Sequence, residues 1–289
     1  MRPDVSILAS EVETTDMRTA AVAHVRTRAA RASDSPAARL LARAGLTARG
    51  IIYILIGWVA VLVALGRGAH EADQEGALQL LAGKPYGAVS LWLLAIGFAA
   101  YALWRLSEAP FGVTGDTSGA GPRLKSLGRA AVYAGFAYLT FTVISGRQRS
   151  QSREQQDVTA KVMQHPGGQW LVGIVGLIVV IIGAVLAIEG IRRTFMKYLR
   201  SGQMSPRTRR VVELLGVIGT IARGVVFALA GILVIDAAVT HRPAKSGGID
   251  KALLTLRGQP FGEVLLMLAA LGLLIFGVYG LCEARWRKV

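Results

Sequence analysis

The sequence contains a single cysteine and few acidic residues, and each shortage excludes a class of protein. Cys282 has no second cysteine with which to form an internal disulfide, a zinc cluster or a redox pair. The 33 Lys and Arg residues outnumber the 18 Asp and Glu residues, which gives a net charge of +15. In a soluble protein this charge would suggest nucleic acid as a partner. Here the basic residues fall in loops between long apolar runs, so we attribute them to membrane topology and expect no nucleic-acid partner.

The sequence also lacks the usual signatures of enzymes and cofactor sites. It has no phosphate-binding glycine loop, no zinc-binding His-Glu-x-x-His and no serine-nucleophile elbow. Three histidines could bind a metal only if the fold brought them together, and we expect solvated loop residues instead: His70, His165 and His241. The acids Glu71, Asp73 and Glu75 lack the spacing of a calcium loop, and we expect them to be solvated as well. We therefore expect a non-enzymatic protein without catalytic residues, metal or cofactor.

Long apolar runs dominate the rest of the chain. Of the 289 residues 53% are hydrophobic, and the mean hydropathy is +0.46. Six runs approach the ~20 residues that one helix needs to span a bilayer. They cover Gly50–Gly66, Tyr86–Trp104, Ala130–Gly146, Gly167–Ile188, Leu214–Val239 and Phe261–Cys282. The sequence therefore predicts an all-α membrane protein with six transmembrane helices.

The first 44 residues have no apolar stretch of the kind found in a cleavable signal peptide. We expect the first membrane helix to act as an uncleaved targeting signal. Residues 1–34 lack sustained periodicity, which predicts a disordered basic tail. A transient Ala/Arg-rich helix lying on anionic headgroups is the alternative for this segment.

The distribution of basic residues predicts the orientation. If the tail, the second and fourth loops and the C-terminus lie inside, 23 of the 33 basic residues are on that side and 10 on the other. Both termini are therefore expected in the cytoplasm. The fourth loop is the most basic segment, and we expect it to contact anionic lipid headgroups. Its basic residues are Arg192, Arg193, Lys197, Arg200, Arg207, Arg209 and Arg210.

An internal repeat divides the chain into three parts. In each part an arginine opens the first membrane helix, a proline 36 or 37 residues later precedes the second, and a glutamate follows 23 residues beyond the proline. The arginines are Arg49, Arg129 and Arg223, the prolines Pro85, Pro166 and Pro260, and the glutamates Glu108, Glu189 and Glu283. We predict three tandem helical hairpins in a pseudo-threefold arrangement, covering residues 35–110, 111–200 and 201–289.

Proline, serine and glycine residues predict where these helices begin and how closely they pack. Each proline is followed two residues later by a glycine, and we expect the prolines to open the second helix of each hairpin. Ser35-Pro36 and Ser205-Pro206 predict N-caps that start two helices in the cytoplasm, before the membrane. Further glycines along the apolar runs predict close helix–helix contacts.

The charged residues recur at the same spacing in all three repeats, which suggests a hypothesis about their role. The first helix of a hairpin runs outward and the second returns, so the Arg and the Glu of one hairpin should lie near each other at the cytoplasmic ends. A charge beside hydrocarbon is unfavourable unless it is paired. We expect these ion pairs to clamp each hairpin. The alternative is that three pairs form a cytoplasmic ring that gates a central path.

Several motifs resemble those of a bacterial membrane family. They are the Arg-Gly-Ile-Ile-Tyr opening at Arg49, Gly-Ala-Leu at Gly76, Lys-Pro-Tyr-Gly at Lys84, Gln-Pro-Phe-Gly at Gln259, and Trp104-Arg105 followed by Glu108-Ala109. The family is domain of unknown function 1206, and the resemblance covers residues 40 to 285 in three copies. The second copy departs most, with Ala130 after its arginine and His165-Pro166-Gly167-Gly168 before its second helix. The resemblance implies a bacterial inner-membrane protein and supplies no activity.

Two function classes therefore remain open at this point. The apolar helices without central charges favour a non-enzymatic membrane scaffold or partner protein. The alternative is a permeation or transport module for small solutes or ions, gated by the ring of Arg–Glu pairs. The expected partners are the bilayer and its anionic headgroups.

Overall fold

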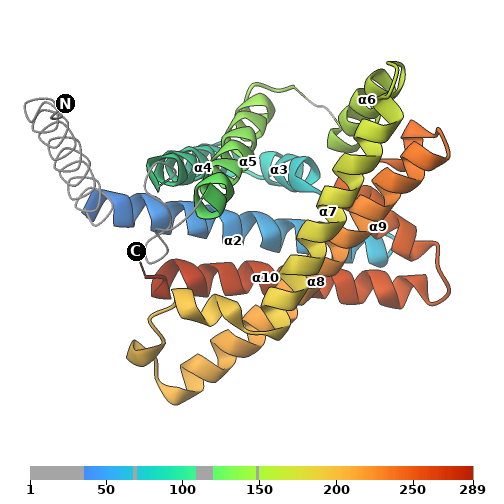
Figure 1. Ribbon diagram of the computed structural model, residues 1–289. Helices are drawn as coiled ribbons and strands as arrows, with labels where there is room; N and C mark the ends of the chain where they lie inside the picture. The colour runs from blue at the N-terminus through green and yellow to red at the C-terminus, as the bar shows by residue number, and fades with distance from the viewer. Residues whose placement is uncertain (1–35, 68–69, 109–119, 148–149, 289) are drawn as a thin grey trace, which may run out of the picture.

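A computed structural model describes residues 36–67, 70–108, 120–147 and 150–288, and this part of the chain is almost entirely helical (Figure 1). It has nine α-helices and no strands. Six of the helices are long and apolar enough to cross a membrane. They are α2 (Pro36–Ala64), α4 (Gly87–Glu108), α5 (Ala120–Ile144), α7 (Gly168–Ile191), α8 (Pro206–Val239) and α10 (Gly262–Trp286). The predicted six-span all-α fold is confirmed.

Shorter helices occupy the connections between the long ones. A short α-helix follows the first long helix of every repeat: α3 (Gln74–Ala82), α6 (Gln151–Met163) and α9 (Gly248–Arg257). Three 3-10 helices complete the described part: η1 (Thr194–Tyr198), η2 (Ser201–Gln203) and η3 (Pro243–Lys245). All of these segments lie between the apolar runs, where the sequence predicted loops. Figure 1 shows α3, α6 and α9 toward one end of the molecule, which we call the short-helix side. The other end, where α2 begins and α10 ends, is the termini side.

Two long helices extend well beyond their apolar runs. The helix α8 has 34 residues, which corresponds to about 51 Å at 1.5 Å per residue. Its N-cap is Ser205, whose hydroxyl accepts a hydrogen bond from the backbone N–H of Thr208, and Pro206 occupies the first turn. This start agrees with the prediction. The helix α2 begins at Pro36, while Ser35 and the predicted tail 1–34 lie outside the described residues.

The prolines before the second helices have a different role from the predicted one. Helices α4, α7 and α10 begin two residues later, at Gly87, Gly168 and Gly262, and the prolines lie in the preceding turns. A Cβ on any of these glycines would collide with a backbone carbonyl oxygen of the preceding short helix. The sharp reversal therefore requires glycine, and proline fixes the turn rather than the first helical residue.

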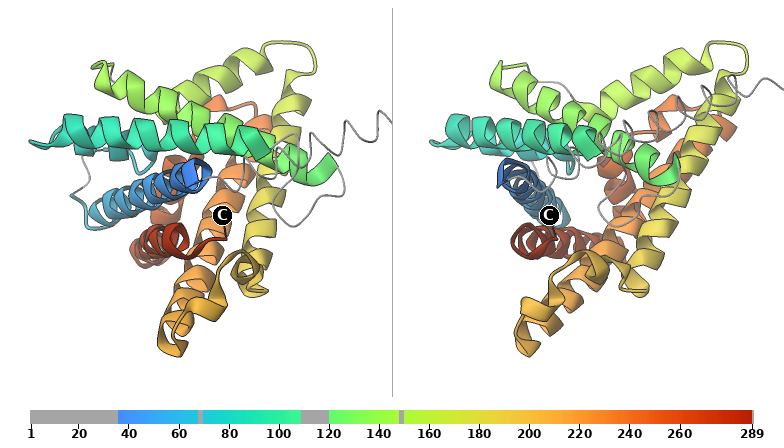
Figure 2. Two further views of the ribbon diagram at one scale, coloured as in Figure 1. Left: turned by 90° about the vertical axis from the view of Figure 1, so that its left-hand side faces the viewer. Right: turned by 60° about the vertical axis from the view of Figure 1, so that its left-hand side comes forward.

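The long helices pack mainly across repeat boundaries. The most extensive contacts join α4 to α5, α7 to α8 and α10 to α2. The second long helix of each repeat thus packs on the first long helix of the next repeat, and the third repeat returns to the first. Figure 2 shows the three pairs as the sides of a triangle. This closed ring gives the predicted pseudo-threefold arrangement its physical form.

Small residues at equivalent positions make these contacts close. A Cβ on Gly50 would lie 2.9 Å from the carbonyl oxygen of Gly277, and one on Gly224 would lie 2.7 Å from that of Gly183. Both pairs follow the same rule: the residue after the repeat arginine meets the residue six positions before the repeat glutamate. At the third interface the corresponding residues are Ala102 and Ala130, both buried. Small-residue contacts of this kind stabilise helix pairs in membranes.

The contacts within a hairpin are unequal. In the first and third hairpins the two long helices also pack on each other, α2 on α4 and α8 on α10. In the second hairpin α5 and α7 make at most marginal contact. The first and third hairpins are therefore closed by contact between their own two long helices, and the second hairpin is open between α5 and α7.

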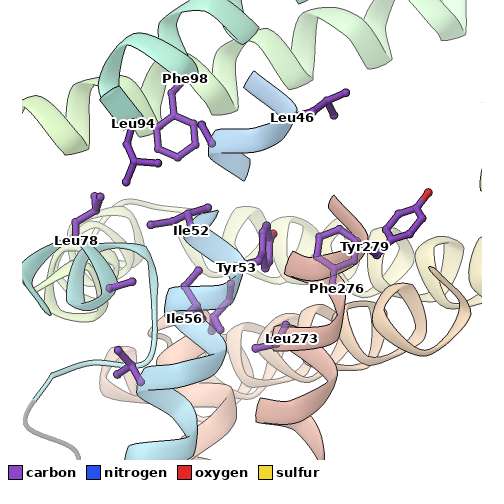
Figure 3. Packing of buried hydrophobic residues seen from close by; sticks show 14 of the residues in the cluster. Leu46, Ile52, Tyr53, Ile56, Leu78, Leu94, Phe98, Leu273, Phe276 and Tyr279 are labelled. Carbon is purple, nitrogen blue, oxygen red and sulfur yellow. The ribbon is translucent and has the colours of Figure 1, made fainter. Parts of the chain in front are cut away.

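The centre of the ring is filled by large apolar side chains (Figure 3). Ile52, Tyr53 and Ile56 of α2 belong to one buried cluster with Leu273 and Phe276 of α10. The rings of Tyr53 and Phe276 pack edge to face with centroids 4.8 Å apart, a favourable geometry for aromatic pairs. A second group, formed by Leu94 and Phe98 with Leu46, lies against the same core.

Candidate functional site

A cluster of buried charged and aromatic side chains lies at the termini side of the ring. Glu283, on the last two turns of α10, forms ion pairs with Arg49 of α2 and Arg287 just beyond α10. The side chains of all three are about nine-tenths buried or more. One carboxylate therefore joins the first and last repeats. Because it receives hydrogen bonds from two guanidinium groups, its charge is compensated in a buried setting.

Aromatic rings also contact the arginines of this cluster. Arg105 of α4 is fully buried, and its Nε and Nη2 donate hydrogen bonds to the hydroxyl of Tyr101 at 3.1 and 2.8 Å. Its guanidinium lies 4.3 Å from the ring centroid of Trp104. The guanidinium of Arg287 lies 5.7 Å from the same ring. Cation–π contacts of this kind stabilise arginines in desolvated surroundings.

The structure places Glu283 differently from the predicted pairing. We expected its partner to be Arg223, in its own hairpin, whereas its carboxylate pairs with Arg49 of the first repeat. Arg223 instead lies over the rings of Tyr53, Phe227 and Phe276, at 4.9 to 5.2 Å from their centroids. Its buried Nε has no hydrogen-bond partner among the described residues. The reason is the cross-repeat packing, which brings α10 against α2.

The predicted pair of Arg129 with Glu189 is not joined either among the described residues. Arg129 lies on α5 and Glu189 on α7, the two helices that scarcely touch each other. Arg129 instead faces the cluster around Tyr101 and Arg105. The side chain of Glu108 lies outside the described residues. For Glu283 the expected clamp within one hairpin is therefore replaced by a clamp between repeats, formed with Arg49, whereas the pairing of Arg49 with Glu108 stays a prediction.

The basic loop forms an exposed strap beside this cluster. A single antiparallel bridge joins Leu199 to Arg287, and the N–H of Arg200 donates to the carbonyl of Trp286 at 2.8 Å. We call this loop, residues 192–210, the strap; its Leu199 is completely buried. Six of the seven basic residues predicted to contact lipid are exposed: Arg192, Arg193, Lys197, Arg207, Arg209 and Arg210. Arg200 is half-buried, and Arg193 forms an exposed ion pair with Glu213.

A second polar cluster, which sequence reasoning missed, lies on the short-helix side. Asp73 caps α3 by accepting the N–H of Gly76 at 3.0 Å, and Asp250 of α9 accepts the N–H of Ala72 at 2.8 Å. Ser152 of α6 donates to the carbonyl of Gly247 at 2.9 Å. All three repeats therefore meet in one buried hydrogen-bond network. It joins their short helices at the end of the ring opposite to Glu283.

These acids correct the expectation of a solvated loop. Asp73 and Glu75 are 2% and 1% exposed, because α3 folds back against the ends of the other repeats. Burial raises the pKa of Asp73 to about 7, and the neighbouring Glu71, Asp250 and Glu75 act in the same direction. Burial also raises the pKa of Asp250. The carboxyl group of Asp73 thus binds a proton near neutral pH.

Neither cluster groups its described side chains as the ligands of a metal ion. Among the described residues no group of three or more His, Cys, Asp and Glu side chains is placed to hold a metal ion. His165 and His241 are exposed, and His70 is half-buried. The chemistry that both clusters can perform is to hold repeats together: an ion-pair clamp at the termini side and a hydrogen-bond network at the other.

The comparisons with known proteins agree with the repeat structure. The profile described as Domain of Unknown Function (DUF1206) matches three times, at residues 44–112, 124–193 and 218–287. Each match contains one repeat arginine, one proline and one glutamate. The chain is 33% identical over 254 residues to "Uncharacterized protein YxxB" of Bacillus subtilis (strain 168), covering 86% of this chain and 90% of that protein. No solved structure matches the chain.

Three consecutive matches span most of the described helices, and the Bacillus relative aligns over nearly its whole length. The ring of cross-repeat helix pairs is therefore built from three copies of one unit. The chain belongs to the DUF1206 family.

Proposed function

We propose that this chain is a non-enzymatic scaffold or partner protein of the bacterial inner membrane, with both termini in the cytoplasm. The observation that carries the proposal is the packed centre of the ring. Tyr53, Phe276 and Leu273 fill it, and the Arg49–Glu283 clamp lies buried at one end. Selectivity filters of channels are built from backbone carbonyls or charged side chains, whereas these three residues fill the axis with aliphatic and aromatic groups.

The hydroxyl groups of α5 point to the same function. Thr140, Thr142 and Ser145 donate to backbone carbonyls of their own helix at 2.7 to 2.9 Å. Their hydrogen-bonding capacity is therefore used locally rather than offered to a passing solute. These residues were the main polar side chains that a permeation path could have used.

Orientation and lipid contact follow from the charge on the termini side. The strap and the start of α8 expose six basic side chains, and both described ends of the chain lie beside them. Positively charged segments stay on the cytoplasmic side. In that orientation the six side chains face anionic headgroups, at ~1 kcal/mol for each basic residue near the surface. The helix α7, with its long exposed apolar face, is then open to lipid or to a protein partner.

Flux through reconstituted liposomes tests this proposal. Wild-type protein is expected to move neither ions nor small metabolites, and Glu283→Gln is expected to behave in the same way apart from lower stability. Glu213→Gln, in the exposed pair with Arg193, is the matched control. If wild-type protein conducts and Glu283→Gln changes the rate while Glu213→Gln does not, the arginine cluster is a gate and the scaffold proposal is wrong.

A further inference from the structure

The opening of the second hairpin contains a cavity of about 710 Å³, lined by α5, α6, α7, α8 and the first residues of α3 and α9. We propose that this cavity binds one membrane lipid. One of its hydrocarbon chains lies along the packed α7–α8 pair, on the side that faces α5, and its headgroup lies against α6 and donates hydrogen bonds to glutamine side chains. The volume is within the ~300–1,000 Å³ range of small-molecule sites in proteins.

The deep part of the cavity is apolar. Leu171, Val172, Val175 and Val179 of α7 face Phe227, Ala230 and Val234 of α8, with Phe136 of α5 on a third side. The α7 residues extend over eight positions, or about 12 Å of helix. This depth is close to half of the ~30 Å hydrocarbon core. The cavity therefore reaches from one membrane surface about one leaflet deep, as a single acyl chain does.

The outer part of the cavity is polar. Gln151, Gln155 and Thr159 of α6 line it together with Gln74 and Ser246. Polar and apolar lining residues are segregated along the membrane normal, with the polar ones on the short-helix side. A uniformly apolar partner helix would leave these amides unpaired, whereas an amphipathic lipid matches both parts.

The sequence explains why the second hairpin is open where the others are closed. In the first hairpin Gly45 lies against Tyr101 and Gly97 against Ala48. In the third, Gly219 lies against Phe276 and Gly272 against Ala222. Counted from the repeat arginine and glutamate, the corresponding glycine positions of the second repeat hold Lys125 and Ile178. These larger residues are incompatible with the same close approach. The cavity is thus encoded in the second copy.

Access to the cavity is lateral. Leu171, Val175 and Val158 line it and are nevertheless about half exposed. On the membrane-spanning α7, Leu171 and Val175 face the hydrocarbon layer, so a lipid chain enters from the bilayer without crossing water. The exposed apolar residues along the rest of α7 border the entrance.

The chemistry of the polar end selects the headgroup. The Oε1 atom of Gln151 is buried and has no hydrogen-bond donor among the described residues. None of the described lining residues is Lys or Arg, so nothing there compensates a negatively charged headgroup. A headgroup that carries donors and no net negative charge satisfies both features. The ammonium group of phosphatidylethanolamine has this chemistry, phosphatidylglycerol adds a negative charge, and phosphatidylcholine has no donor.

A matched pair of substitutions on α7 tests the hydrocarbon site. Val175 and Val185 are 48% and 45% exposed, and only Val175 lines the cavity. Native mass spectrometry measures phosphatidylethanolamine retained by purified protein after exchange from vesicles of that lipid. Val175→Trp is expected to lower retention about tenfold or more, which is a 1.4 kcal/mol effect, whereas Val185→Trp leaves it unchanged. Equal retention by both variants, or none by wild type, would overturn the proposal.

Two further measurements complete the test. Photolabelling uses only the wild type and so does not depend on the folding of a variant, and a comparison of three lipids identifies the headgroup. A phosphatidylethanolamine with a photoreactive chain, applied to the wild type, is expected to label residues 171–179 and 227–234. Labelling spread evenly over α7 would instead indicate only a lipid annulus and overturn the site. In the headgroup comparison, wild type should prefer phosphatidylethanolamine to phosphatidylglycerol and phosphatidylcholine, and Gln151→Leu should reduce that preference. Equal retention of all three lipids would overturn the headgroup assignment.

Discussion

Replacing Glu283 with glutamine tests the clamp between the first and last repeats. The substitution keeps the size of the side chain and removes a charge that two arginines share in a buried setting. Removing one partner of a buried ion pair costs about 3–5 kcal/mol, because the remaining charge is left uncompensated. Here Arg49 keeps a contact with the ring of Phe276, at 5.5 Å, and Arg287 keeps one with Trp104. We therefore expect a loss near 3 kcal/mol, at the lower end of that range.

The measurement is unfolding in mixed micelles with increasing denaturing detergent, followed by helical circular dichroism. The control is Glu213→Gln, which breaks the exposed pair with Arg193 and should cost no more than about 1 kcal/mol. The double variant with Arg49→Gln should recover part of the loss, since Arg287 is then the only one of the two arginines left without its carboxylate. If Glu283→Gln is no more destabilising than Glu213→Gln, the clamp does not stabilise the ring and our reasoning is refuted.

Three further predictions concern other parts of the molecule. Burial raises the pKa of Asp73 to about 7, above its ordinary value of 3.8, so its contribution to stability is full below pH 4 and is lost as the pH rises to 7. The protection factors of the α3 amides, which are corrected for the intrinsic pH dependence of exchange, should therefore fall over this range, and Asp73→Asn, which can still cap the helix, should abolish this fall; an unchanged pH profile of the protection factors in that variant would contradict the assignment. Gly183→Ala should destabilise by about 1–3 kcal/mol, because its Cβ would lie 2.6 Å from the carbonyl oxygen of Gly224, whereas Gly135→Ala, with open space around it, should be neutral or slightly stabilising in the same unfolding assay. Equal effects of these two changes would argue against close packing of α7 on α8. Replacing Arg207, Arg209 and Arg210 with glutamine should reduce flotation with anionic vesicles by ~1 kcal/mol per residue, and undiminished flotation would leave their positive charge explained by topology alone.

The sequence predicted the number of long helices and the residues that punctuate them, because these depend on local chemistry. The cap at Ser205 is one example, since it needs only a serine and a following proline. The partner of Glu283 could not be predicted in this way. The repeat spacing predicts all three arginines and all three glutamates at the same end of their helices, so it is compatible with pairing inside a hairpin or between hairpins. Only the packing of α10 on α2 decides between them.

The short helices were missed for a related reason. Segments such as Gln74–Ala82 and Gln151–Met163 are too short and too polar to stand out as helices by periodicity alone. The caps at Asp73 and Ser150 were usable signals, because each side chain accepts an N–H from the first turn of the helix that follows. The burial of Asp73 depends instead on contacts with the other repeats, and no local pattern contains that information.

The long helices pair across repeats and leave the second hairpin open. Disulfide formation in a Cys282→Ser background tests this arrangement most directly. A Cβ on Gly173 would lie 3.9 Å from that of Ala238, a separation that suits a disulfide, so Gly173→Cys with Ala238→Cys should crosslink α7 to α8. Gly128→Cys with Ile178→Cys, at positions that would meet only in a closed second hairpin, should stay reduced. Peptide mass spectrometry distinguishes the two results, and a crosslink at the second pair but not at the first would contradict the account.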